Sequence, residues 1–116
     1  MGLINLFTDL QNRRKVRDQA RLCRIQGMTD AMRDTTLAVA SLAVLTQHED
    51  ATEQYLRSWL DNRLRTSLPG IDPATILLLV QLAIMIYQAL QAVGFLDANG
   101  LSAVSPATIN EHFGGL

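Results

Sequence analysis

The residues that could do acid–base, thiol or metal chemistry are few in this 116-residue chain, which has two histidines and one cysteine. His48 is followed by Glu49 but has no second histidine four residues later, the spacing that a zinc-binding helix requires. Cys23 has no partner for a disulfide or a redox pair, so we expect it to be a small buried residue. No third group near His112 in the sequence could orient it for catalysis.

A short turn near the end of the chain resembles a calcium loop only in its first residues. Asp97, Asn99 and Gly100 have the right types, but the sixth position of such a loop requires glycine and holds Ser102. We therefore expect a tight turn here. Taken with the histidines and the cysteine, this predicts a non-enzymatic protein without a metal site, a cofactor or a small-molecule substrate.

Charge is distributed unevenly along the chain. Residues 1–24 hold six of the ten bases and only two of the eleven acids, about +4, and the other 92 residues carry about −5. The predicted contacts for an anionic partner are five arginines, four of which share one stripe of a helix: Arg13, Arg14, Arg17, Arg21 and Arg24. An acidic protein, an anionic membrane and nucleic-acid phosphates all fit this stripe, as does a merely solvated helical face. No aromatic residue is interleaved with the bases, which disfavours stacking on single strands.

The start of the chain does not have the order of a cleavable secretory signal. Its apolar residues, such as Leu3 and Phe7, precede the bases instead of following them. We therefore expect an intracellular protein or a component of a virion-like particle, with membrane association as an open alternative.

Helical spacing of apolar residues predicts an all-α fold of four to five helices in an antiparallel, bundle-like arrangement. No alternating β-branched run bounded by a tight turn is present. The expected division is a basic amphipathic N-terminal helix over 1–27 and a helical body over 28–116. The predicted helices run from Leu3 to Arg24 or Gln26, from Thr29 or Asp30 to Gln47, from Asp50 to Leu68, from Ala74 to Val93, and from Ser105 to Phe113.

Several residues are expected to begin or end these helices. Gly27 should stop the first one. Asp50 with Glu53 is similar to a capping box at the start of the third. Asp72 is expected to cap the fourth helix, with Pro73 at its first position.

The segment from Ala74 to Leu96 has 23 residues without a charge, long enough to cross a bilayer. Its glutamines form a thin polar stripe that could face either solvent or other helices in a membrane bundle: Gln81, Gln88 and Gln91. The alternative is a helix buried in protein, with more apolar surface than its short neighbours can cover. Burial against other subunits then follows, through a predicted assembly face made of Ile76, Leu77, Leu79, Val80, Ile84, Ile86 and Leu90.

Three functions therefore stay open. The first is a structural or assembly subunit that packs against copies of itself or other chains in a homo- or hetero-oligomer, such as a virion component. The second is a small membrane protein in which residues 74–96 span the bilayer and the basic first helix lies on its surface. The third, less favoured, is a nucleic-acid-associated helical protein that uses the stripe from Arg13 to Arg24.

Overall fold

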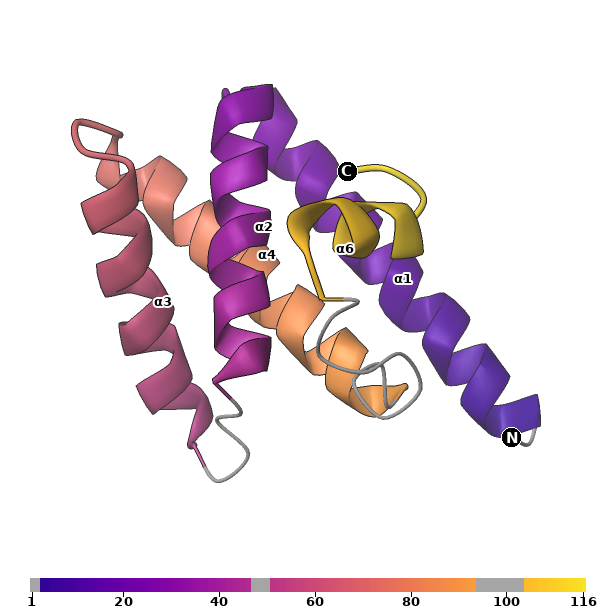
Figure 1. Cartoon of the computed structure of the whole chain (residues 1–116). Coiled ribbons are helices and arrows are strands. Elements are labelled where there is room, and N and C mark those ends of the chain that lie inside the picture. The colour runs from indigo at the N-terminus through magenta and orange to yellow at the C-terminus, as the bar shows by residue number, and fades with distance from the viewer. Residues whose placement is uncertain (1–2, 47–50, 94–103) are drawn as a thin grey trace.

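The structure, a computed structural model, describes residues 3–46, 51–93 and 104–116, with side chains from Leu6 onward. These stretches contain helices and no strand, as Figure 1 shows, and their bounds are α1 Leu3–Ile25, α2 Asp30–Leu45, α3 Glu53–Ser67, α4 Pro73–Ala92 and α6 Pro106–His112. The predicted all-α class and the long apolar helix near residues 73–93 are confirmed.

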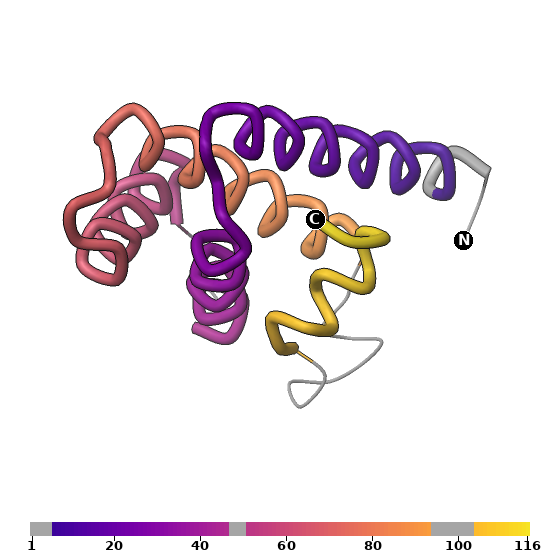
Figure 2. The backbone as a smooth tube through the Cα atoms, turned by 90° about the horizontal axis from the view of Figure 1, so that it is seen from above, coloured from indigo at the N-terminus to yellow at the C-terminus, as the bar shows by residue number. Residues whose placement is uncertain are grey.

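The long helix α4 is the centre of the arrangement. It contacts α1, α2 and α3, and α2 also contacts α3 and α6. Figure 2 shows α4 with α1 on one side and α2 and α3 on the other. In Figure 1, α1 runs antiparallel to α4 and α3 runs antiparallel to α2, which is the bundle-like packing that the sequence predicts.

The turn between α1 and α2 forms as expected. Gly27 has φ +111°, a backbone conformation that L side chains rarely adopt, so glycine ends α1 here without strain. The Thr29 hydroxyl then accepts a hydrogen bond from the backbone N–H of Met32 at 3.2 Å and caps α2.

Two predicted helix starts need correction. The cap of α3 is Thr52, whose hydroxyl accepts from the N–H of Tyr55 at 3.1 Å, so Asp50 is not the cap of this helix; Asp50 itself lies outside the described residues. Asp72 does occupy the cap position of α4, but its side chain makes no capping hydrogen bond. The start of α4 uses the backbone carbonyl of Asp72, which accepts from the N–H of Ile76 at 3.0 Å, and the preset φ of Pro73.

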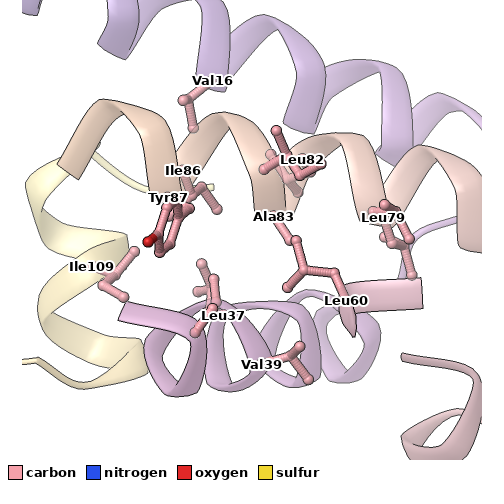
Figure 3. Packing of buried hydrophobic residues seen from close by; sticks show 14 of the residues in the cluster. Val16, Leu37, Val39, Leu60, Leu79, Leu82, Ala83, Ile86, Tyr87 and Ile109 are labelled. Atoms are coloured by element: carbon pink, nitrogen blue, oxygen red, sulfur yellow. The ribbon is translucent and has the colours of Figure 1, made fainter. Parts of the chain in front are cut away.

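The core gathers apolar side chains from every described helix. Figure 3 shows Val16 of α1 on one side of α4 and Leu37 of α2 with Ile109 of α6 on the other, with Ile86 and Tyr87 among them. Small residues line the contacts and let the helices approach closely: Ala20 and Cys23 on α1, Ala40 and Ala43 on α2, and Ala83 and Ala89 on α4, all buried. Helix α1 therefore joins the core through Val16, Ala20 and Cys23.

Candidate interaction surface on the first helix

Three of the five predicted contact arginines bond to the protein itself. Arg13 forms an ion pair with Asp9 at 3.0 Å, one turn earlier in α1. Arg17 donates from Nη1 to the carbonyl oxygen of Phe113 at 3.4 Å, and Arg24 donates from Nε to that of Leu116 at 2.8 Å. This side of α1 therefore holds the C-terminal segment of the chain in place.

Arg14 and Arg21 point away from the body. Both are exposed, and Arg14 makes no ion pair or hydrogen bond within the part of the chain that the structure describes. Arg21 lies 3.8 Å from Asp18, a loose pair in which both side chains are largely in water and which contributes little to stability. These two bases, with the remaining donors of Arg17, are available to an anionic partner.

The same helix also exposes apolar side chains. Of the eight large hydrophobic residues exposed in the described chain, five belong to α1: Leu6, Phe7, Leu10, Leu22 and Ile25. The three in the first turns are 52%, 63% and 55% exposed. Phe7 lies on the side of α1 opposite Ala20 and Cys23, which face the core, and Leu10 and Leu6 lie progressively closer to the Ala20 edge.

We define the α1 outer face by seven residues within a sector of about 100° on the helix, leaving out Arg24 at the edge of this sector because it is bonded to Leu116 and Asp30: Leu6, Phe7, Leu10, Arg14, Arg17, Arg21 and Ile25. Its first turns are apolar, its middle is basic, and Asp18 lies at its edge. The sequence signal for it is the spacing of Leu3, Phe7 and Leu10, which puts these apolar residues on one side of the helix ahead of the bases. The sequence placed the apolar assembly face on α4, which has the greater hydropathy, and assigned the first helix to contacts with anionic partners and, in the spanning alternative, to the membrane surface.

The predicted assembly face on α4 is mostly not at the surface. Its residues other than Leu77 are buried by the chain itself, and Leu77 is 60% exposed. The expectation that short neighbours leave this helix partly uncovered is wrong for these six residues. The long α1 covers one side, α2 and α3 cover the others, and small residues at the contacts let all three lie close.

The glutamine stripe of α4 lies at the surface, next to Leu77. Gln88 and Gln91 are exposed and Gln81 is half-buried, and Gln91 donates from Nε2 to the Tyr87 hydroxyl at 2.8 Å. The amides thus meet water and a hydroxyl group, which removes the cost of burying them unpaired. A small polar groove between α1 and α4 borders this stripe, lined by Asn12, Lys15, Met85 and Gln88.

The titratable groups that could do chemistry are held in structural contacts. Burial raises the pKa of the Cys23 thiol to about 11, and its sulfur lies 3.5 Å from the Leu78 carbonyl oxygen of α4. Burial, reinforced by the positive charge of Arg13, lowers the pKa of His112, and Asp9 opposes this shift. The His112 ring packs edge-on against Phe113, with centroids 4.9 Å apart.

Among the described residues, no group of three histidine, cysteine or acidic side chains is placed to hold a metal ion. His48 and the turn with Asp97, Asn99 and Gly100 lie outside the described residues. No family model, no curated protein and no solved structure matches this chain.

Proposed function

We propose that this protein is a non-enzymatic structural subunit that is held in a larger assembly through the α1 outer face. The observation that carries the proposal is the share of exposed large apolar side chains that lie on this one face, four of the eight in the described chain. Three of them, Leu6, Phe7 and Leu10, lie within about 6 Å of one another along the helix axis, and apolar side chains gathered at the surface are characteristic of an interaction site. The exposed bases beside it favour a partner with negative charge.

The proposal moves the attachment surface from α4 to α1. The side chains that the sequence favoured on α4 already fill the core of the chain, and using them in assembly would require the other helices to leave. The α1 outer face is available without any rearrangement. Attachment through it leaves the core intact.

Light scattering over a range of protein concentrations tests the part of this proposal that concerns copies of the chain. Attachment to copies of the chain would give a mass above that of the monomer, which returns to the monomer value in the double variant Phe7→Gln/Leu10→Gln, whereas a monomer at every concentration would assign the face to a partner other than a second copy. The matched control is Leu77→Gln, because Leu77 is as exposed as these residues but lies on α4. Self-association that persists in the double variant would contradict the use of α1.

A bilayer-spanning role is a second candidate with one specific observation in its favour. Helix α4 is 20 residues long, with a mean hydropathy of 1.9 over 18 residues, which meets the length and composition of a span. However, 56% of that window is buried inside the chain, and core helices have the same features. Residues 94–96 of the predicted span lie outside the described residues.

Nucleic-acid binding would have to use fewer bases than the sequence suggests. Arg13, Arg17 and Arg24 already make bonds within the protein. Such binding would leave Phe7 and Leu10 in water, since phosphate contacts do not cover apolar side chains. The proposal therefore favours a partner that uses both parts of the α1 outer face.

A further inference from the structure

Resting on the proposed function, we infer that the partner of the α1 outer face is an anionic lipid surface. In this docking, α1 lies along the membrane surface, with its first turns between the headgroups and its middle turns against their phosphates.

The apolar end of the α1 outer face projects from the rest of the protein, as insertion into a membrane surface requires. Figures 1 and 2 show the N-terminal turns of α1 extending beyond α4 and α6. Leu6, Phe7 and Leu10 are each more than half exposed there. A projecting helix end suits the headgroup boundary of a bilayer, where amphipathic helices bury their apolar side chains. A folded protein partner would instead need a groove shaped to receive it.

The basic part of the surface continues from the apolar end. Arg14, Arg17 and Arg21 follow Phe7 and Leu10 within the same sector of the helix. The nearest acid, Asp18, is only loosely paired with Arg21. Each base near an anionic membrane strengthens binding about fivefold. Apolar insertion and charge attraction therefore both come from the same face of α1.

A second copy of the chain is a poorer occupant of this surface. Two α1 outer faces brought together would place three arginines of one copy close to three of the other, with one aspartate each to balance them. Like charges that approach in this way oppose association. An anionic lipid surface meets the same arginines with opposite charge and also accepts the apolar side chains.

Co-sedimentation of the full chain with vesicles tests this inference. One vesicle preparation contains phosphatidylcholine alone, and in the other about a third of the lipid is phosphatidylglycerol. We expect binding to the anionic vesicles, little binding to phosphatidylcholine, and loss of binding as salt screens the charges.

Two pairs of variants separate the apolar and the basic contributions. Phe7→Gln/Leu10→Gln and Arg14→Gln/Arg21→Gln should each raise the lipid concentration for half-maximal binding roughly tenfold or more. The controls are Leu77→Gln on α4 and Arg57→Gln/Arg65→Gln on α3, where the arginines pair with Glu53 and Asp61. These controls should bind within about twofold of the unaltered chain, and circular dichroism should show that all variants remain helical.

The inference is overturned if the chain does not bind anionic vesicles, if it binds both preparations equally, or if the controls weaken binding as much as the α1 variants. Self-association that depends on Phe7 and Leu10, without vesicle binding, would overturn the inference and leave the proposed function standing. If the chain neither self-associates nor binds vesicles through α1, both the inference and the proposed function are overturned.

Discussion

At the scale of single residues, Cys23 illustrates how packing removes reactivity. Its thiol is buried against α4, and burial raises its pKa from 9.0 to about 11. The thiolate is the reactive form, so the shift alone lowers its fraction roughly 100-fold near neutral pH. We expect iodoacetamide to modify Cys23 at least that much more slowly in the native chain than in urea, as followed by mass spectrometry. Equal rates would show that α1 does not pack on α4 at this point.

His112 predicts a pH dependence of stability. Its pKa in the folded chain lies below the ordinary value of 6.5, so the unfolded chain binds the proton more readily. This effect on stability is absent well above pH 6.5, and the free energy of unfolding should decrease as the pH falls below that value. Urea titrations between pH 7.5 and 5 should show this decrease, and His112→Gln should reduce the slope. An unchanged slope in the variant would mean that His112 is as solvated in the folded chain as in the unfolded one.

The arginines of α1 show which contacts sequence reasoning could not reach. Their spacing correctly placed them on one stripe, but Arg17 and Arg24 bond to carbonyl groups 96 and 92 residues further along the chain. Helical periodicity describes neighbours within one element only. The partners of these residues depend on where α6 folds back, which no local pattern specifies.

At the scale of elements, the helix types and most boundaries could be predicted, because apolar periodicity and Gly27, Pro73 and Ser105 act locally. How much of the α4 surface the other helices cover could not be predicted in this way. The apolar residues around α4 suggested more apolar surface than its neighbours could cover. Ala20 of α1 and Ala43 of α2, both buried, instead let the neighbouring helices come close enough to cover it. How much surface a neighbour covers depends on crossing geometry, which the hydropathy of α4 alone does not contain.

Because α4 lies at the centre of the fold, truncating a side chain on its buried side should lower the free energy of unfolding far more than truncating one on its exposed side. Leu82 is fully buried and Leu77 is not. Leu82→Ala should lower the free energy of unfolding by about 2–5 kcal/mol through lost contacts and a cavity, whereas Leu77→Ala should change it by less than about 0.5 kcal/mol. Urea unfolding followed by circular dichroism measures both. Similar effects at the two positions would mean that α4 is not enclosed as described.

At the scale of the whole molecule, the remaining question is whether α4 keeps this enclosed position when membranes are present. Peripheral docking through α1 leaves the strip of α4 with Leu77 and Gln88 in water, whereas a bilayer span would place both residues in hydrocarbon. The two positions lie about 16 Å apart along the helix, well within a hydrocarbon thickness of about 30 Å. Cysteine labelling at these positions therefore distinguishes the two states.

In a Cys23→Ala background, Leu77→Cys and Gln88→Cys should react with a membrane-impermeant maleimide at least about tenfold faster than Leu82→Cys, whose position is buried. We expect the same order with anionic vesicles present, because docking through α1 does not change the surroundings of α4. Protection of Leu77→Cys and Gln88→Cys on adding vesicles would indicate that α4 leaves the core and enters the bilayer. The loss of its contacts with α1, α2 and α3 would then have to be offset by burial in lipid, and the function would be that of a spanning protein.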